Sequence, residues 1–303
     1  MSVRMSRALV ASLFALVPAS ALAQPLTFER SLAVGASPTL DASTGSGSIT
    51  VHAGSGSTIV VKGTVEIRRG SNVPANAAEL ARQLVASPPI TQTGDAVTVG
   101  RIADHATRQA VSVSYDISVP AAAAVQVDSG SGDVAVSGVN GRVKAHSGSG
   151  GVTATAIGGD IDARTGSGDI VVKDVRKAAS LSTGSGTIAG VLTGAGDVKA
   201  TSGSGDITLE GVNGMLAAST GSGSIGVEGT PTADWRVSAA SGDLTVALPS
   251  GKGFTLDAST SSGTLDIPLA VQGRSERRRV QGTVGGGGPM LRLSTSSGDI
   301  AVR

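Results

Sequence analysis

The sequence contains no cysteine among its 303 residues. The chain can therefore form no disulfide bond and no thiolate metal site. A bacterial lipoprotein needs a cysteine at the start of its mature chain, and the residue expected there, Gln24, is not one. These absences exclude a disulfide-stapled fold and this form of lipid attachment.

Aromatic residues are almost as scarce: one Trp, one Tyr and three Phe. A wide globular core, or a platform of rings that stacks on sugars, would normally need more of them. A thin core of Ile, Val, Leu and Ala would not. Glycine, in contrast, is abundant, with 44 residues.

Long apolar runs are also missing beyond the amino terminus. Arg4 and Arg7 precede a short apolar run at 8–17, and the small-residue pattern Ala21-Leu22-Ala23 follows it. This pattern predicts a secretory signal peptide over 1–23 and a mature chain that begins at Gln24. No later segment approaches the ~20 apolar residues of a membrane-spanning helix. We therefore expect an exported protein of the periplasm, cell surface or extracellular space, with no transmembrane segment in the mature chain.

The charges are balanced. The predicted leader holds two of the 24 basic residues and none of the 23 acidic ones, which leaves 22 basic against 23 acidic residues. A chain without a basic excess has no electrostatic reason to bind nucleic acid or an anionic membrane.

What the sequence does contain is a repeated phrase. TSGSGDITLEGVNG at 201–214 restates SGSGDVAVSGVNG at 129–141. The residue after each Ser-Gly element recurs at steps of 18, 18, 18, 19, 18, 19 and 21 residues. These marker residues are Asp133, Gly151, Asp169, Thr187, Asp206, Ser224, Asp243 and Thr264, and Asp299 follows after an interruption. A fixed step over many copies is typical of stacked structural repeats.

Each repeat contains two short runs with the alternation of a β-strand, separated by Gly-rich turns. We expect the apolar members of the first run to face inward: Val134/Val136, Ile170/Val172, Ile207/Leu209, Ile225/Val227, Leu244/Val246 and Leu265/Ile267. Trp235 aligns with Ile161 and Val198 and is expected to face inward as well. At the corners, glycine would supply positive φ and close backbone approach, while Ser and Asp would bond local amides.

The marker alternates between Asp and a residue without charge, so a period of 36–37 overlies the period of 18. Two explanations are open. Either the alternation separates like charges in a stack of 18-residue coils, or the true unit consists of two such layers.

These patterns predict an all-β fold, a β-solenoid or parallel β-helix of ~18-residue repeats, with one short helical insertion near the amino terminus. After the leader, 24–303 would form a single domain. Its parts would be an irregular segment at 24–127 with a helix at about 74–86, regular repeats at 128–270, a charged Gly-rich loop at 273–289 and a closing strand at 290–303. AVTVG at 96–100 and VSVSYDISVP at 111–120 should also be strands.

The segment at 273–289 carries Arg274, Arg277, Arg278 and Arg279 beside Glu276, then four glycines. We interpret it as an exposed hairpin or loop whose charges hinder end-to-end strand pairing.

No catalytic constellation is evident. His52, His105 and His146 share no ligand spacing, and no serine is singled out beside a histidine and an acid. Calcium-binding β-rolls repeat Gly-Gly-x-Gly-x-Asp every nine residues, which this sequence does not do. The sequence thus indicates no catalytic, cofactor-binding or metal-binding residues, no cofactor and no enzyme, although calcium at a corner Asp stays open.

Residues 111–141, VSVSYDISVPAAAAVQVDSGSGDVAVSGVNG, resemble a bacterial putative-adhesin family of unknown function with β-strand repeats and SGD-[IV]-x-V turns. The ending at 277–303 and the early repeats at 47–65 fit the same family. The resemblance implies an exported β-solenoid of the cell envelope without established catalytic residues.

Three hypotheses for function follow. The first is a non-enzymatic binding or structural module whose partner is an unknown envelope protein or polysaccharide. The second is a glycan-acting β-helix enzyme, which would need Asp, Lys, Arg or His from several coils to converge on one face. The third is a self-assembling envelope scaffold that associates through its open ends.

Overall fold

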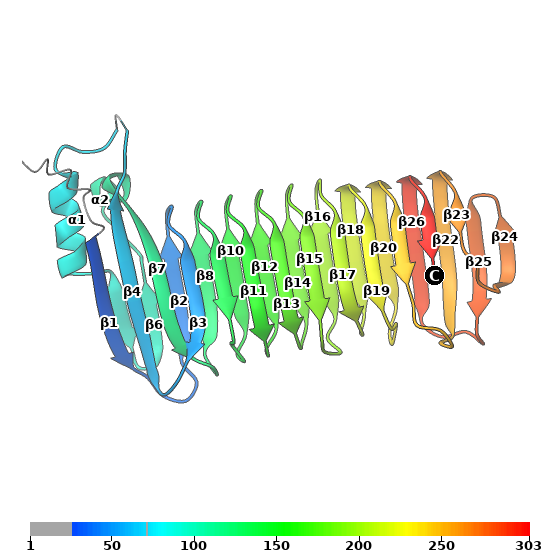
Figure 1. The fold of residues 1–303 in the computed structure, drawn as a ribbon, viewed down its shortest axis with the longest axis horizontal. Helices are drawn as coiled ribbons and strands as arrows, with labels where there is room; N and C mark the ends of the chain where they lie inside the picture. The colour runs from blue at the N-terminus through cyan, green and yellow to red at the C-terminus, as the bar shows by residue number, and fades with distance from the viewer. Residues whose placement is uncertain (1–25, 71) are drawn as a thin grey trace, which may run out of the picture.

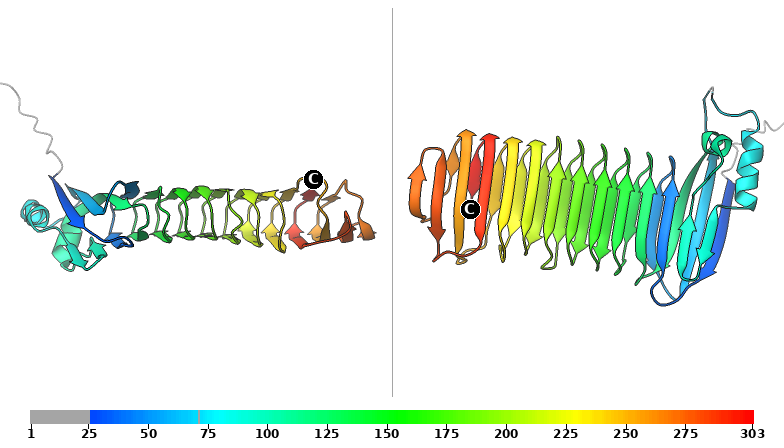
Figure 2. Two further views of the ribbon diagram at one scale, coloured as in Figure 1. Left: turned by 90° about the horizontal axis from the view of Figure 1, so that it is seen from below. Right: turned by 180° about the vertical axis from the view of Figure 1, so that it is seen from behind.

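A computed structural model describes residues 26–70 and 72–303 of the chain. The predicted signal peptide, 1–23, lies outside the described residues. Two sheets, here called A and B, face each other along a thin, elongated stack (Figure 1), and the edge-on view shows them as two close layers (Figure 2). The all-β solenoid expected from the repeats is confirmed.

Sheet A has 13 strands in the spatial order β1-β4-β7-β3-β9-β11-β13-β15-β17-β19-β21-β27-β23. Their bounds are β1 (Leu26–Ala33), β3 (Ile49–Gly54), β4 (Thr58–Ile67), β7 (Val111–Pro120), β9 (Val134–Ser137), β11 (Val152–Ile157), β13 (Ile170–Val175), β15 (Ile188–Leu192), β17 (Ile207–Val212), β19 (Ile225–Gly229), β21 (Leu244–Ala247), β23 (Leu265–Asp266) and β27 (Ile300–Val302).

Sheet B has 14 strands in the order β24-β25-β22-β26-β20-β18-β16-β14-β12-β10-β8-β2-β6-β5. Their bounds are β2 (Thr39–Thr44), β5 (Ile90–Thr93), β6 (Ala96–Val99), β8 (Ala124–Ser129), β10 (Val143–Ser147), β12 (Ile161–Thr165), β14 (Ala179–Thr183), β16 (Val198–Ser202), β18 (Leu216–Ser222), β20 (Trp235–Ser241), β22 (Phe254–Ser262), β24 (Gln272–Glu276), β25 (Arg279–Val284) and β26 (Met290–Ser297).

One coil consists of one strand in each sheet and about 18 residues. Val143 in β10 pairs in parallel with Val125 in β8 on one side and with Ile161 in β12 on the other. Each of these steps is one repeat, so the structural unit is the single 18-residue coil rather than two layers. The 36–37 period therefore reflects only which residue, Asp or an uncharged one, occupies the marker position in alternate coils.

The core is a thin layer of apolar side chains from both sheets, as the alternation predicted. Trp235 is buried, and its Nε1 donates a hydrogen bond to the Gly214 carbonyl at 2.9 Å. The expectation for Leu265 and Ile267 is only partly met, because both are half-buried. They lie in the terminal coil, where no further coil of the described chain covers them.

A second inward row is polar. At the end of each sheet B strand from β8 to β22, except β20 with Ala239 at this position, a buried Ser or Thr hydroxyl donates to a glycine carbonyl of the adjacent coil at 2.7–3.0 Å. We call this row the buried hydroxyl ladder; its members are Ser129, Ser147, Thr165, Thr183, Ser202, Thr220, Thr295 and Thr260. The first four also accept a hydrogen bond from the glycine amide three residues later. Much of the serine and threonine in the repeated phrase is thus used by the scaffold.

The corner aspartates bind the next coil. Each carboxylate accepts a hydrogen bond at 2.8 Å from the backbone amide of the equivalent residue one coil away, as Asp133 does from Gly151 and Asp169 from Thr187. Asp243 and Asp299 occupy adjacent coils, so alternation is not strict: Asp299 donates its amide to Asp243. The expectation that alternation separates stacked carboxylates fails at this step, where one carboxylate binds the other residue's amide.

The amino-terminal end is built from a long insertion. The coil formed by β2 and β3 lies beside the coil of β8 and β9, although residues 58–120 separate them in sequence. This insertion forms β4 to β7 and two helices, α1 (Ala77–Ala86) and α2 (His105–Ala110). The helix expected at about 74–86 begins at Ala77, and α2 was not anticipated. Helix α1 packs against β1 and β4 at this end of the stack (Figure 1).

The carboxyl-terminal end departs from sequential stacking. The segment expected to be one closing strand, 290–303, forms two strands, and β26 lies between β20 and β22. The charged Gly-rich segment 273–289, interpreted above as an exposed hairpin or loop, contains most of the antiparallel hairpin β24–β25, which pairs with β22 at the end of sheet B. The last coil in space is therefore β22/β23, and not the last coil in sequence.

Candidate binding surface on sheet B

The side chains that could meet a partner are the outward members of each strand, because the inward members form the core. Sheet A is poor in charge along the column that runs through Ala135, Thr153, Val171, Ala189 and Thr208. The second outward column of sheet A carries Lys173, Glu210 and Glu228. Sheet B is richer in charge, since its outward positions in the regular coils include Asp128, Lys144, His146, Asp162, Arg164, Lys199 and Arg236. Sheet B is thus the candidate functional face.

The charged part of this face spans three neighbouring strands, β8, β10 and β12. We define the charged patch as Asp128, Lys144, His146, Asp162 and Arg164. The His146 Nδ1 atom lies 3.5 Å from Asp128 Oδ1, and Arg164 Nε lies 2.8 Å from Asp162 Oδ1. The hydrogen bond to Asp162 raises the pKa of the Arg164 guanidinium. Asp128 and Asp162 lie on the sheet face, in β8 and β12, and not at the corners where the marker aspartates lie.

A row of small hydroxyl side chains continues the column from Arg164 toward the carboxyl-terminal end of the stack. The strand registers place these residues side by side in successive strands, and each is half-buried. The row consists of Ser182, Thr201, Ser219, Ser238, Ser294 and Ser259, and we call it the surface hydroxyl row. Together with the charged patch it forms an uninterrupted polar column along the stack.

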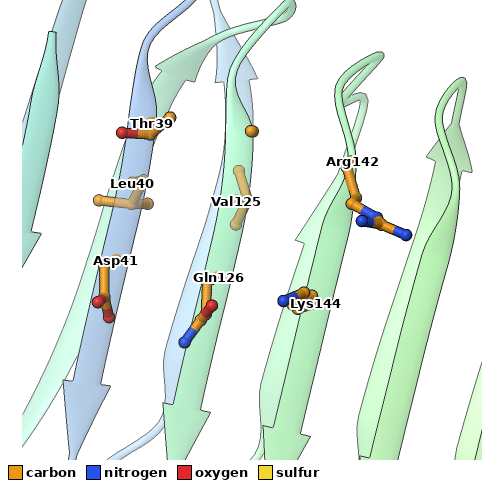
Figure 3. Close-up of a pocket in the computed structure, with 8 residues that line it drawn as sticks. Thr39, Leu40, Asp41, Val125, Gln126, Arg142 and Lys144 are labelled. Atoms are coloured by element: carbon orange, nitrogen blue, oxygen red, sulfur yellow. The ribbon is translucent and has the colours of Figure 1, made fainter.

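Two shallow hollows lie beside this column. The first, of about 200 Å³, is lined by residues of β2, β8 and β10, among them Asp41, Gln126 and Lys144. Figure 3 shows these three side chains in adjacent strands, with Arg142 near the start of β10. The second, of about 330 Å³, runs across the starts of β12, β14, β16 and β18, with Asp162, Lys199 and the exposed Met215 on its border. Arg142 borders both hollows.

The geometry favours binding over catalysis. The charged patch lies on an open sheet face, with His146 58% and Arg164 61% exposed. Enzymes usually enclose their reacting groups, because exclusion of water strengthens the electrostatic interactions that stabilise a transition state. Nothing encloses this face in the described residues.

The three histidines do not converge. His52 lies on sheet A with its Nδ1 atom 3.2 Å from Asp116 Oδ1, His146 lies on sheet B, and His105 begins α2. Among the residues that the structure describes, no group of three or more His, Asp or Glu could hold a metal ion. The candidate surface was not predicted from the sequence. Its visible signal was the polar residues in the second strand run of two repeats, RVKAH at 142–146 and DIDAR at 160–164.

One family model matches part of the chain. Residues 159–303, slightly less than half of the chain, match the family described as Toastrack DUF4097. The expected resemblance to a family of unknown function is thereby supported for this part, while the SGD phrase as its signature stays a prediction. No curated protein matches the chain.

Among solved structures, the chain is similar to a putative cell adhesion protein from Clostridium sporogenes ATCC 15579. The two share 8% identity over 92% of this chain and 99% of that chain, with a TM-score of 0.21. A TM-score this low does not establish a shared arrangement, so no property of that protein is transferred to this chain.

Proposed function

We propose that this chain is an exported, non-enzymatic β-solenoid of the cell envelope that binds another envelope component, a protein or a polysaccharide, through the outer face of sheet B. The observation that carries the proposal is the uninterrupted polar column on this face, from the charged patch through the surface hydroxyl row. Side chains repeated at the strand spacing of ~4.8 Å suit an extended partner that lies along the stack.

The repeated residues of the corners do not carry the proposed binding. Their Ser, Thr, Gly and Asp residues are engaged in coil-to-coil hydrogen bonds, which build the scaffold. The outward residues of sheet B therefore remain as the candidates for contact with a partner. Export rests on the leader predicted at 1–23. We treat 24–303 as one domain because the coils in its described part share one continuous core. Within the described residues, no helix combines the length and the apolar character needed to span a membrane.

The test is a pull-down from the producing cell's envelope fraction with the chain 24–303, followed by mass spectrometry and glycan analysis. A matched pair of variants identifies the face. Lys199→Glu reverses an outward charge on sheet B, and Lys173→Glu does the same on sheet A. We expect one enriched component, lost with Lys199→Glu and kept with Lys173→Glu. No enrichment by a folded chain, or equal loss with both variants, would contradict the proposal.

A glycan-acting enzyme is a second candidate, favoured by one observation: Asp128, His146 and Arg164 from three coils lie in one column. If this candidate holds, envelope glycans incubated with the chain gain new chain ends, and Asp128→Asn and His146→Ala each abolish that gain.

A further inference from the structure

The carboxyl-terminal end of sheet B is an unpaired edge. Among the residues that the structure describes, strand β24 pairs with β25 on one side only, and all five of its residues are exposed. An exposed edge strand presents a row of unpaired N–H and C=O groups, which is a template for another strand. The half-buried Leu265 and Ile267 lie in the terminal coil at the same end, so apolar surface is also left thinly covered there.

The direction of the free backbone groups follows from the hairpin. Glu276 pairs with Arg279 across a two-residue turn, so this closing pair exchanges hydrogen bonds. In an antiparallel pair, hydrogen-bonded and non-hydrogen-bonded positions alternate. Gly273 and Ser275 therefore direct their N–H and C=O groups away from β25, toward the open side.

The charges of the edge are arranged for one partner. Arg274 and Glu276 lie on the same face of the sheet, with Arg274 Nε 3.4 Å from Glu276 Oε1. If a second β24 lies antiparallel with its Ser275 opposite Ser275, then Arg274 of each copy lies opposite Glu276 of the other. The same register makes Ser275 opposite Ser275 the hydrogen-bonded pair that its free groups require, whereas Gly273 faces the turn of the other copy, because β24 ends at Glu276.

Neighbouring registers of the same parity are unfavourable. A shift by two residues places Arg274 opposite Arg274 or Glu276 opposite Glu276, and like charges directly opposite each other destabilise a strand pair. In the favoured register the turn residues Arg277 and Arg278 lie opposite Gly273 and Gln272, which carry no charge.

We infer that two copies of this chain associate through their β24 edges, antiparallel and centred on Ser275, to form a twofold-symmetric dimer. Such a dimer is isologous, because the same patch serves in both copies. It joins the two B sheets into one continuous surface and directs the helical ends away from each other. The inference goes beyond the proposed function, since the sheet B surface of one copy needs no second copy to exist. It also reverses the expectation that the charges of 273–289 hinder pairing.

The charge pattern gives a test with internal rescue. Sedimentation velocity of the chain 24–303 over a wide concentration range should show a concentration-dependent dimer. Arg274→Glu alone and Glu276→Arg alone each create two like-charge pairs and should weaken the dimer about tenfold. The double exchange Arg274→Glu with Glu276→Arg should restore it. Arg236→Glu, on a central strand of the same sheet, is the control and should leave the dimer unchanged.

A covalent test uses the absence of native cysteine. Ser275→Cys places two thiols at the twofold axis, where a hydrogen-bonded pair has a Cα separation of ~5.5 Å, within the disulfide range. Mild oxidation should therefore yield a disulfide-linked dimer with Ser275→Cys and none with Ser259→Cys on β22. A monomer at all concentrations, or failure of the double exchange to restore the dimer, would overturn the inference, and neither result would bear on the sheet B binding surface.

Discussion

At the scale of single residues, the repeated phrase is explained by contacts between coils. In the hydroxyl ladder, Thr183 donates to the Gly168 carbonyl at 2.9 Å and accepts from the Gly186 amide at 3.1 Å. One buried side chain thus satisfies two backbone groups that secondary structure leaves unpaired at the corner. This double use accounts for a Ser or Thr in front of nearly every Gly-Ser-Gly element.

The first prediction concerns this ladder. Thr183→Val keeps the shape of the side chain but removes the partner of the buried Gly186 amide and of the half-buried Gly168 carbonyl. We expect it to lower the free energy of unfolding by about 1–3 kcal/mol. Thr201→Val, at an outward position of β16, is the matched control and should have little effect. Equal loss in both variants, measured by chemical denaturation, would show that the ladder hydroxyl has no special role.

The corner glycines are required mainly for space. A Cβ atom at Gly168 would lie 2.2 Å from the Gly150 carbonyl oxygen of the adjacent coil, whereas one at Gly226 would meet nothing within 4 Å. The sequence expectation of positive φ holds at corners such as Gly223 and Gly242, but close approach of backbones is the more general reason.

The second prediction uses this contrast. Gly168→Ala forces adjacent coils apart and should destabilise the chain by about 1–3 kcal/mol or more. Gly226→Ala lies in a strand with open space and should be neutral or stabilise by up to roughly 1 kcal/mol. Thermal unfolding of the two variants checks the pair, and a stabilising Gly168→Ala would contradict the contact.

The third prediction concerns pH. The hydrogen bonds from the Thr264 backbone amide and side chain hold the pKa of Asp299 below its usual value of 3.8. A carboxyl whose pKa is lower in the folded state stabilises the fold above its unfolded pKa, and this stabilisation is lost as pH falls through the folded value. Asp299→Asn should therefore be less stable than the native chain at neutral pH, with the difference shrinking below about pH 4. Unfolding temperatures at several pH values test this, with Glu228→Gln on sheet A as control; a constant difference would contradict it.

The Tyr115 hydroxyl contrasts with the hydroxyls of the buried hydroxyl ladder, because it is buried without a hydrogen bond. Within the described residues the Tyr115 hydroxyl has no hydrogen-bond partner, and burial raises its pKa. The ring itself packs edge-on against Phe28, with centroids 6.4 Å apart. The contribution of Tyr115 to stability therefore comes from its ring.

At the scale of elements, the two ends of the stack differ from the middle. The amino-terminal end is closed by α1 and the strands of the insertion. The carboxyl-terminal end is closed by a strand that returns: β26 pairs with both β20 and β22. In the sequence, β22, β23 and the β24–β25 hairpin therefore come before β26, although β26 is the strand that connects them to the rest of sheet B.

The fourth prediction follows from that order. Removal of residues 290–303 deletes β26 and β27 and leaves the edges of β20 and β22 unpaired. Hydrogen exchange should accelerate in these two strands, and the truncated chain should aggregate through its open edges. The coils of β10 to β15 should stay protected, because each coil contacts only its neighbours. Unchanged protection in β20 and β22 would show instead that these strands can pair directly.

At the scale of the whole molecule, the middle of the stack is modular. From β8 to β14 every sheet B strand pairs with the next at a step of 18 residues. Nearest-neighbour contacts then carry most of the stability, as in other repeat proteins.

The fifth prediction tests this modularity. Deletion of residues 148–165 removes one complete coil and brings β10 against β14 and β9 against β13 with their registers kept. The new contact stacks Asp133 on Asp169, an arrangement already present between Asp243 and Asp299. We expect a folded, cooperatively unfolding protein that is shorter by ~4.8 Å in small-angle scattering. Deletion of residues 148–156, half a coil, exchanges strands between the sheets and should abolish folding; a folded half-coil variant would contradict the coil assignment.

The sequence by itself determined the regular middle of this protein. The 18-residue step and the two-residue alternation fix which side chains face inward, because burial of apolar groups in a stack leaves one arrangement for such a pattern. The inward positions of Val134, Ile170, Leu244 and Trp235 needed no tertiary information.

Tertiary structure alone decided the ends and the surface. A local pattern cannot show that residues 58–120 are inserted beside a coil or that β26 enters before β22, since both depend on pairings between segments far apart in sequence. The sheet B column was hidden for a related reason: outward residues follow no apolar rule, and only the strand registers bring Asp128, His146 and Arg164 together. Likewise, the sequence alone could not show that Arg274 and Glu276 lie on an open sheet edge, because only the strand order places β24 at the end of sheet B.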